Sequence, residues 1–217
     1  MDKLITKDGS ITFHNDTYDE TYHSLSGAEE EAVKKHAEPA CIRELAKKGE
    51  IRILDVCFGL GYNSAAAIDI ALSENPRCKI FIVGLENDKD ILNEILTLSP
   101  AFKCYDLIKR VVVNNLKLET DNVNIIIKLA DARKSILAVK ETEFDVVFHD
   151  PFSPKKCPEL WTKEFFKEVY LRMKTCGILT TYSCARVVRD NLVNAGFAVS
   201  DGPSVGRRAP STVAKKK

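Results

Sequence analysis

Apolar positions fall into short continuous runs from residue 51 onward, and these runs alternate with segments of helical periodicity. At residues 51–57, 79–85 and 144–148 most side chains are apolar. A strand that is exposed on one face alternates apolar and polar residues, so unbroken runs indicate strands that are buried on both faces. The pattern therefore predicts an α/β fold in which helices cover both faces of a mostly parallel sheet.

Seven strands are expected in this part of the chain, at residues 51–57, 79–85, 123–129, 144–148, 177–182, 197–200 and 211–214. Helices are expected between them, at residues 62–73, 91–98, 102–116 and 161–174, with one more that ends at Ala195. The carboxyl ends of parallel strands share one edge of the sheet, and ligands bind at that edge. The residues just after each strand are therefore the candidates for function.

The first 49 residues follow a different pattern. Residues 4–13, interrupted by Asp8 and Gly9, predict a small hairpin, and residues 18–27 read as a polar loop with two tyrosines. Helices are predicted at residues 28–37 and 39–49. The length of 217 residues suits one domain, with residues 1–49 as an appendage that covers the ligand and residues 50–217 as the core.

Charge and composition exclude several classes of protein. The chain has 32 Lys and Arg residues against 31 Asp and Glu residues, so its net charge of +1 cannot attract nucleic acid by itself. Binding to RNA would need a local basic patch. No apolar run reaches the roughly 18 residues of a membrane span, and the N-terminus lacks the apolar segment of a secretory signal. A cytoplasmic protein without membrane contact is expected.

The cysteine pattern points to reduced thiols. There are seven cysteines, and no two of them form a CxxC pair. An odd number without paired spacing favours neither a disulfide framework nor a structural zinc site. His149 lacks a second ligand at metal spacing and is expected in the core. No bound metal is therefore expected.

Glycines and acids follow the first two strands. Asp55, Gly59 and Gly61 belong to a strand–helix turn in which glycine lets the backbone approach a ligand. Glu86 follows the next strand, where a carboxylate can accept both ribose hydroxyls of a nucleoside. The alternative is that the glycines serve only the packing of an ordinary turn and that Glu86 is a solvated acid at the end of a strand. Loop and acid together favour a nucleoside site.

The type of nucleoside follows from the acid that opens the turn. A dinucleotide site would read GxGxxG and place a pyrophosphate at the helix N-terminus. Asp55 would repel a phosphate but suits the amino-acid part of S-adenosylmethionine. After the third strand, Asp131 and Ala132 can meet an adenine amino group. Asp131 can also cap the helix that contains Arg133, and the two roles are compatible.

A stiff segment follows the fourth strand. Pro151 and Pro154 keep it from entering a helix directly, so Asp150 and Phe152 are held at the mouth of the sheet. Asp150 can orient or deprotonate an amine, and Phe152 can stack on a planar base. The alternative is an ordinary turn with Phe152 packed in the core. In this architecture ligands bind and react at the carboxyl ends of the strands, so the functional interpretation is favoured.

Together these residues resemble a known family. The chain is similar to the methyltransferase domain of the bacterial tRNA wobble-uridine enzyme that makes 5-methylaminomethyl-(2-thio)uridine. The likeness rests on residues 18–24, 27, 30, 58–63, 150–155, 158–162, 181–185, 188–189, 195–197 and 206–208. Its most specific part is DPFSPKKCPELWT, whereas the glycine loop alone would indicate only a class I methyltransferase.

The resemblance implies a Rossmann-like class I methyltransferase fold with a reversed last strand, and S-adenosyl-L-methionine as the methyl donor. It implies that Asp150 and Phe152 lie at the reactive end of the site and that a loop containing Tyr22 and Ser24 covers the cofactor. The expected cofactor-binding residues are Tyr22, Ser24, Asp55, Phe58, Gly59, Gly61, Asn63, Glu86, Asp131 and Ala132.

Two features depart from the family. Cys57 stands where the motif usually has its first glycine, so its side chain is expected to narrow the turn or to shift the methionine end of the cofactor. Some bacterial relatives carry a fused flavin-dependent oxidase domain. No second nucleotide-binding loop is present here, so FAD is not expected, and the route that supplies the aminomethyl substrate stays open.

The function expected from the resemblance is N-methylation of the 5-aminomethyl group on the wobble uridine, with the anticodon stem-loop of tRNA as partner. The alternatives are methylation of a small amine or of another RNA, and a non-catalytic cofactor-binding module. An acid at the acceptor side argues against the last. The local basic surface for tRNA is expected to comprise Lys155, Lys156, Arg186, Arg189, Arg207 and Arg208.

Overall fold

A central sheet organises the molecule, which is represented by a computed structural model that describes residues 1–140, 143–206 and 208–217. Its strands are β4 Glu50–Val56, β5 Lys79–Glu86, β6 Lys117–Glu119, β7 Val123–Leu129, β8 Phe144–His149, β9 Met173–Thr181, β10 Phe197–Asp201 and β11 Thr212–Lys216. They lie in the order β10-β11-β9-β8-β4-β5-β7-β6. Neighbouring strands from β9 to β7 are parallel. β6 is antiparallel to β7, and β11 is antiparallel to both of its neighbours.

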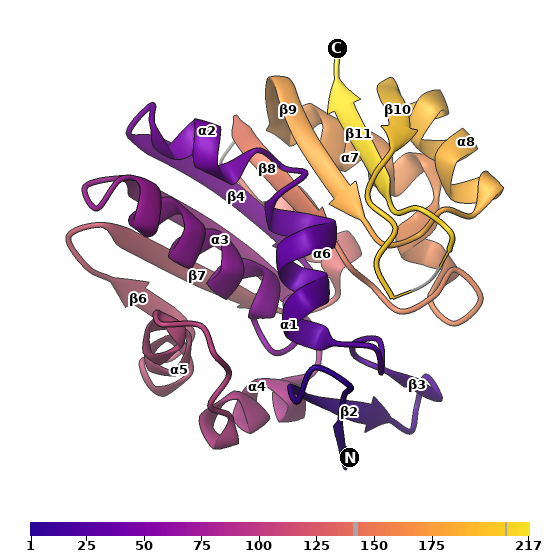
Figure 1. Ribbon diagram of the computed structural model, residues 1–217. Helices are drawn as coiled ribbons and strands as arrows, with labels where there is room; N and C mark the ends of the chain where they lie inside the picture. Colours follow the sequence, from indigo (N-terminus) through magenta and orange to yellow (C-terminus); the bar gives the residue numbers. More distant parts are fainter. Residues whose placement is uncertain (141–142, 207) are drawn as a thin grey trace.

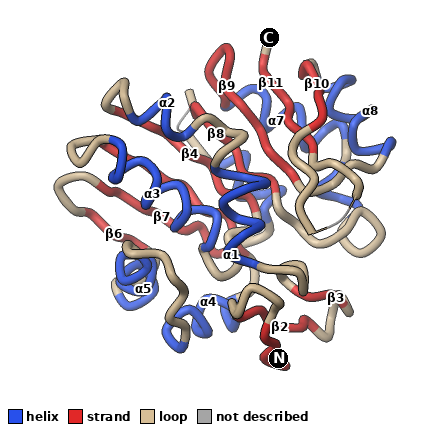
Figure 2. Tube along the Cα trace, in the orientation of Figure 1, coloured by secondary structure: helices blue, strands red, loops and turns tan. Residues whose placement is uncertain are grey.

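Helices cover both faces of this sheet, as Figure 1 and Figure 2 show. They are α1 Ala28–Glu31, η1 Ala32–Ala37, α2 Ile42–Ala46, α3 Tyr62–Glu74, α4 Lys89–Glu94, η2 Ile95–Thr97, α5 Tyr105–Val113, α6 Ala132–Ala138, η3 Pro158–Trp161, α7 Lys163–Arg172 and α8 Arg186–Ala195. In Figure 1, α1, α2 and α3 lie in front of the sheet, and α6 and α7 lie behind it. Each face accordingly has its own cluster of buried apolar side chains.

The N-terminal segment forms a second, smaller sheet. Its strands are β1 Asp2–Ile5, β2 Ile11–Asn15 and β3 Glu20–Thr21, paired antiparallel in the order β1-β2-β3. The chain then enters α1 and continues through η1, which is a π-helix and packs against α3. π-Helical turns are rare and occur often at functional sites.

The structure confirms the α/β fold, the mostly parallel sheet with helices on both faces and the reversed last strand. The expected count of seven strands is wrong, because β6 adds an eighth. In β6 only Leu118 is buried, so no apolar run marks it. β9 begins at Met173 and not at residue 177, because its polar residues 174–176 extend the strand beyond the core.

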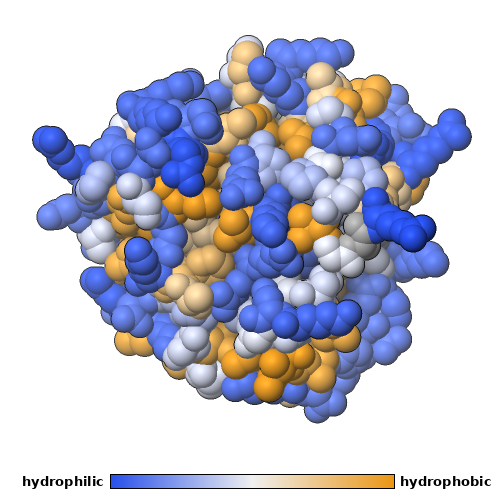
Figure 3. Space-filling model, viewed as in Figure 1, coloured by the Kyte–Doolittle hydropathy of each residue, from blue (hydrophilic) through white to orange (hydrophobic). Residues whose placement is uncertain are grey.

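The surface mixes polar and apolar residues. In the view of Figure 3 hydrophilic side chains cover most of this face, with an apolar area at the bottom, where the N-terminal strands lie. Among the described residues, Ile5 and Leu25 are two of the large apolar side chains that are exposed. Of the helices in the described ranges, none combines the length and the apolar character that crossing a membrane requires.

Candidate functional site

A cavity of about 430 Å³ lies at the carboxyl ends of the parallel strands. This volume is in the range of sites for small molecules and cofactors. One side, called the sheet wall here, consists of cavity residues in the loops after β4, β5, β7 and β8. The opposite side, the N-terminal wall, consists of cavity residues within residues 18–35.

The turn after β4 adopts left-handed backbone geometry. Gly59 and Gly61 have φ angles of 53° and 72°, which glycine adopts without strain. Cys57 has a φ angle of 65°, so this cysteine takes a conformation that favours glycine. Phe58 and Gly59, which are expected cofactor-binding residues, line the cavity together with Cys57. A Cβ atom at Gly61 would lie 2.8 Å from both Phe58 and Ile108, so glycine is needed there for packing.

Glu86 holds the sheet wall together. Its carboxylate accepts hydrogen bonds from the backbone N–H groups of Gly59 at 2.8 Å, Asn87 at 2.8 Å and Asp88 at 2.9 Å. Burial raises the pKa of Glu86, and the three backbone bonds oppose this shift only in part. The residue therefore links the loops after β4 and β5 and lines the cavity.

Asp55 lies behind the wall. It is completely buried, does not line the cavity and accepts a hydrogen bond from the Ser64 hydroxyl at 2.6 Å. Burial raises its pKa well above the ordinary value. Of the expected cofactor-binding residues, Asp55 and Gly61 do not line the cavity.

Asp131 and Ala132 also line the sheet wall. Asp131 caps α6 by accepting a hydrogen bond from the backbone N–H of Arg133 at 2.8 Å, as the sequence predicted. Its carboxylate also pairs with the Arg133 guanidinium, and this contact is the main cause that lowers the pKa of Asp131. The acid is therefore ionised, and it remains part of the cavity surface.

Asp150 sits where β8 ends and is held from two sides. Asn63 donates from Nδ2 to Asp150 Oδ2 at 3.0 Å, and His36 Nε2 lies 3.6 Å from Asp150 Oδ1. Asn63 and Asp150 line the cavity, whereas His36 is buried behind them, with Nδ1 at 3.3 Å from the Thr180 hydroxyl. Within the described ranges, Asn63 Oδ1 is buried and has no hydrogen-bond partner. A cavity residue thus offers an unused acceptor next to the carboxylate.

Phe152 is a half-buried cavity residue in an aromatic group. Its ring stacks on Tyr18, with centroids 4.6 Å apart, and meets the edge of Tyr22 at 5.0 Å. The Trp161 indole donates to the backbone carbonyl of Phe152 at 2.9 Å, which fixes the loop. Phe152 therefore packs on the core and also presents part of its surface to the cavity.

The N-terminal wall is attached to the sheet wall by side chains. Tyr22 donates from its hydroxyl to Asp88 at 2.6 Å. Ser153 donates two hydrogen bonds to the Glu20 carboxylate, one from its backbone N–H and one from its hydroxyl. Ser24, which also lines the cavity, donates from its backbone N–H to Glu31 at 3.1 Å. The expected loop with Tyr22 and Ser24 thus lies over the cavity.

Five of the six expected basic residues are described, and Arg207 lies outside the described residues. None of the five lines the cavity. Four are exposed, namely Lys155, Lys156, Arg186 and Arg208. The loop that contains Arg208 reaches the cavity through Val205 and Gly206.

Arg189 is committed to the fold. Its guanidinium donates to Asp201 at 2.6 Å, to the Thr212 hydroxyl at 3.0 Å and to the Ser211 carbonyl at 3.1 Å. These bonds tie α8 to β10 and β11. Three of the guanidinium donors of Arg189 are thus used within the protein, whereas the other expected basic residues that are described are exposed.

His149 lies in the core, as the sequence predicted. His149 is completely buried among aromatic rings, and burial lowers its pKa to about 3. In the described ranges, no group of three or more His, Cys, Asp or Glu side chains could hold a metal ion. None of the seven cysteines, all of which lie in the described ranges, forms a disulfide. Burial raises the pKa of Cys57 well above its ordinary value, so this cavity cysteine is a thiol and not a thiolate at neutral pH.

Sequence reasoning missed three residues next to the cavity. Glu31 and Lys35 form a buried ion pair in the N-terminal wall, and His36 backs Asp150. In the sequence they belong to EEEAVKKH, which reads as an ordinary helix with a charged surface. Glu31, Lys35 and His36 continue the buried helix face of Ala28 and Ala32, and only their charged or polar character makes them read as surface residues.

Comparisons with known proteins agree on one family. Residues 102–217 match the family model described as S-adenosyl-L-methionine-dependent methyltransferase. An uncharacterized protein of Methanocaldococcus jannaschii is 39% identical over 97% of the chain, which spans 58% of that protein. The bifunctional protein MnmC of Methylibium petroleiphilum, named for tRNA 5-methylaminomethyl-2-thiouridine biosynthesis, is 26% identical over 91% of the chain, which spans 32% of it.

Solved structures give the same result. The crystal structure of MnmC2 from Aquifex aeolicus has a TM-score of 0.87 and 36% identity, covering all of this chain and 70% of that one. Spermidine synthase from Thermotoga maritima, at a TM-score of 0.62 and 14% identity, shares the fold alone; the match covers all of this chain and 69% of that one. The chain belongs to the S-adenosyl-L-methionine-dependent methyltransferases and carries the domain that it shares with the MnmC proteins.

Proposed function

We propose that the protein is a tRNA N-methyltransferase that methylates the 5-aminomethyl group of the wobble uridine, giving 5-methylaminomethyl-(2-thio)uridine. One observation carries the proposal: Asp150 and Phe152 both line the cavity at the strand ends, and Asn63 donates a hydrogen bond to the Asp150 carboxylate. The MnmC relatives, whose printed name refers to this modified nucleoside in tRNA, support the choice of acceptor.

The residues present fit S-adenosyl-L-methionine. Glu86 places a carboxylate beside the glycine turn, where ribose hydroxyls would be donors. Asp131 and Ala132 lie at the end suited to the adenine. The unpartnered Oδ1 of Asn63 can accept a hydrogen bond from a bound ligand, which explains why a buried amide oxygen lacks a protein partner.

The chemistry needs alignment and a free amine. When bound, S-adenosyl-L-methionine supplies a methyl group on its sulfonium sulfur. The protein contributes mainly by orienting the acceptor, since a displacement in line with the leaving sulfur depends on proximity and geometry. Asp150 accepts a proton of the substrate ammonium and leaves the nitrogen with a free lone pair. Asn63 keeps the carboxylate in place during this step.

RNA recognition requires further residues around the cavity. The aromatic pair of Phe152 and Tyr18 offers a stacking surface for an unstacked base. Exposed basic residues from three different loops or helices can meet phosphates of the anticodon stem-loop: Lys155, Lys156, Arg186 and Arg208. Arg207 belongs to the same proposal by its position in the sequence.

Methyl transfer into tRNA tests the proposal. The parent protein receives labelled S-adenosyl-L-methionine and tRNA that carries 5-aminomethyl-uridine, and digested nucleosides are separated. We expect the label in 5-methylaminomethyl-(2-thio)uridine. Asp150→Asn should slow transfer by about 10²–10⁴-fold, because proton removal from the amine is lost.

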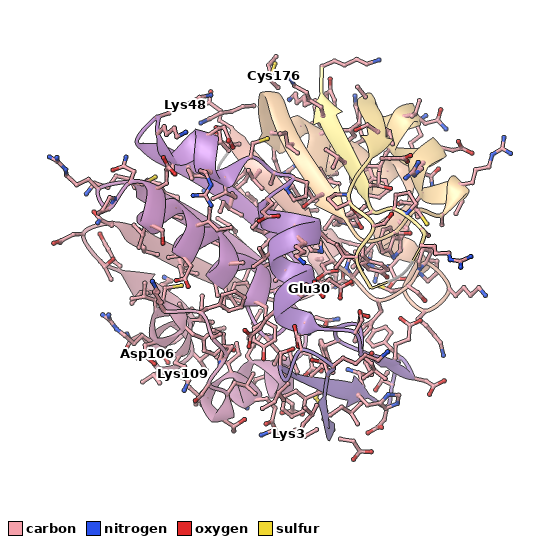
Figure 4. All side chains as sticks on the ribbon, in the orientation of Figure 1. Lys3, Glu30, Lys48, Asp106, Lys109 and Cys176 are labelled. Carbon is pink, nitrogen blue, oxygen red and sulfur yellow. The ribbon has the colours of Figure 1, made fainter. Side chains whose placement is uncertain are left out.

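Asp106→Asn serves as the matched control, because Asp106 is exposed on α5 and does not line the cavity (Figure 4). It should transfer methyl groups like the parent. Label that enters only a small amine or another nucleoside would replace the tRNA acceptor with one of those substrates. Equal rates for Asp150→Asn and the parent would remove Asp150 from the reaction.

A further inference from the structure

Two ion pairs with the same spacing differ in their surroundings. Glu30 and Lys34 pair on the outside of the helix, where their side chains are 38% and 52% exposed, and Figure 4 shows Glu30 at the surface of α1. Glu31 and Lys35 pair one position later, and their side chains are 11% and 4% exposed. Both members of the second pair line the cavity.

A buried ion pair lowers the stability of the fold unless further interactions compensate for the lost hydration of its two charges. Removing two charges from water costs several kcal/mol, and their attraction often fails to offset this. An exposed pair at the same spacing on the same helical segment would have supported the helix without that cost. The position of the pair in the wall of a cavity therefore points to a ligand.

The pair keeps donors and acceptors for that ligand. A lysine ammonium has three N–H donors, and Glu31 is the hydrogen-bond partner of Lys35 within the described ranges. Glu31 accepts from Lys35 with one oxygen and from the Ser24 N–H with the other, and each oxygen has a further lone pair. Burial would raise the pKa of Glu31, but Lys35 and Ser24 outweigh it and lower the pKa, so Glu31 is ionised.

The location of the pair within the cavity narrows the choice of ligand group. η1 carries Lys35 and packs against α3, and the next residue, His36, reaches Asp150. Glu31 and Lys35 thus lie toward the part of the cavity that contains Asn63 and Asp150. Glu86 and Asp131 lie in other loops of the sheet wall, where the ribose and adenine are placed by the proposed function.

We propose that Glu31 and Lys35 form the binding subsite for the α-amino-acid group of the cofactor. Lys35 donates to the cofactor carboxylate, and Glu31 accepts from the cofactor ammonium. The ammonium and carboxylate groups of the cofactor are attached to the same carbon atom. Two protein charges that lie side by side can therefore bind both groups at once. The inference rests on the cofactor part of the proposed function and is independent of the RNA acceptor.

Calorimetry with two ligands tests the subsite. S-Adenosyl-L-homocysteine carries the amino-acid group, whereas 5′-methylthioadenosine lacks it. Lys35→Met should weaken binding of S-adenosyl-L-homocysteine by about ten- to a hundredfold, the range for a lost hydrogen bond to a charged group. Binding of 5′-methylthioadenosine should change by less than about twofold. Lys34→Met, which alters the exposed pair, should leave both affinities unchanged.

A second variant protects the test against misfolding. Lys35→Met leaves Glu31 buried without its partner, so the double variant Glu31→Gln, Lys35→Met removes both charges together. It should bind 5′-methylthioadenosine like the parent and lose the preference for S-adenosyl-L-homocysteine. Lys35→Arg, which keeps the charge, should recover part of that preference.

The outcomes separate this subsite from the proposed acceptor. Equal losses for the two ligands would assign the pair a purely structural role, and unchanged affinity for both would place the amino-acid group elsewhere. Either result overturns the inference. No RNA enters the experiment, so a protein that discriminates the ligands as expected but fails to methylate tRNA would overturn only the choice of acceptor.

Discussion

The two walls of the cavity are held by different kinds of bond. In the sheet wall, Glu86 accepts from backbone N–H groups of the loops beside it. In the N-terminal wall, Glu20 and Tyr22 reach side chains or loops more than 60 residues away along the chain. The first wall forms when the sheet forms, whereas the second must dock on it. The N-terminal wall therefore depends on contacts between segments that are distant in the chain.

Two buried acids of the sheet and Asp8 of the N-terminal turn have pKa values that shift in opposite directions. Burial raises the pKa of Glu86 and Asp55 beneath the sheet wall. Burial acts the same way on Asp8 in the N-terminal turn, but hydrogen bonds from Ser10 and Thr6 outweigh it and lower the pKa of Asp8 to about 2. Acid should therefore loosen the N-terminal region while it stabilises the core.

The largest expected effect follows from breaking the sheet wall. Glu86→Ala removes the acceptor for three backbone N–H groups, so the free energy of unfolding should fall by about 1–3 kcal/mol. Affinity for S-adenosyl-L-homocysteine should fall by about ten- to a hundredfold, because the ribose loses a charged acceptor. Urea denaturation and calorimetry measure the two effects.

Glu119→Ala is the matched control, since Glu119 is exposed at the end of β6. It should change neither quantity by more than the experimental error. If Glu86→Ala keeps the parent's affinity, the ribose is bound by other residues.

A smaller effect is expected from releasing the N-terminal wall. Glu20→Gln weakens the two bonds from Ser153, which corresponds to about 1 kcal/mol for a partly buried hydrogen bond. Limited proteolysis should cut within residues 1–26 sooner than in the parent, while the melting temperature of the core stays nearly constant. Asp16→Asn, at an exposed position of the same segment, should be cut like the parent. A uniform loss of stability would show that both walls unfold as one unit.

The smallest effect concerns pH. The lowered pKa of Asp8 gives stability that is present above the unfolded value near 3.8 and is lost as the pH falls toward about 2. Pepsin cleavage of the N-terminal region should therefore accelerate across this window. Asp8→Asn, which does not ionise, should cleave with little dependence on pH. The same slope in both proteins would assign the acid sensitivity to another group.

Sequence reasoning succeeded where burial leaves a local pattern. β4, β5, β7 and β8 were found because unbroken apolar runs mark strands with two covered faces. The rule that ligands bind at strand ends then located Glu86, Asp131 and Asp150 in one cavity.

The rest depends on contacts between distant segments. Arg189 looks like a free surface cation until β10 and β11 supply its acceptors. From the sequence, Asp55 reads as an acid that faces a ligand, whereas in the structure it is hydrogen-bonded to Ser64 of α3. Lys35 and His36 read as surface residues because of their charged or polar side chains, although they share a helix face with the buried Ala28 and Ala32.

The position of β11 has a consequence for synthesis on the ribosome. β10 emerges first, yet it joins the sheet only through β11, which lies between it and β9 (Figure 1). Until residues 212–216 emerge, β10 has no strand to pair with, and the edge of β9 is open to other chains. Arg189 in α8 also lacks two of its hydrogen-bond acceptors until then, because these belong to Ser211 and Thr212. The nascent chain therefore carries an unprotected sheet edge until this last strand is made.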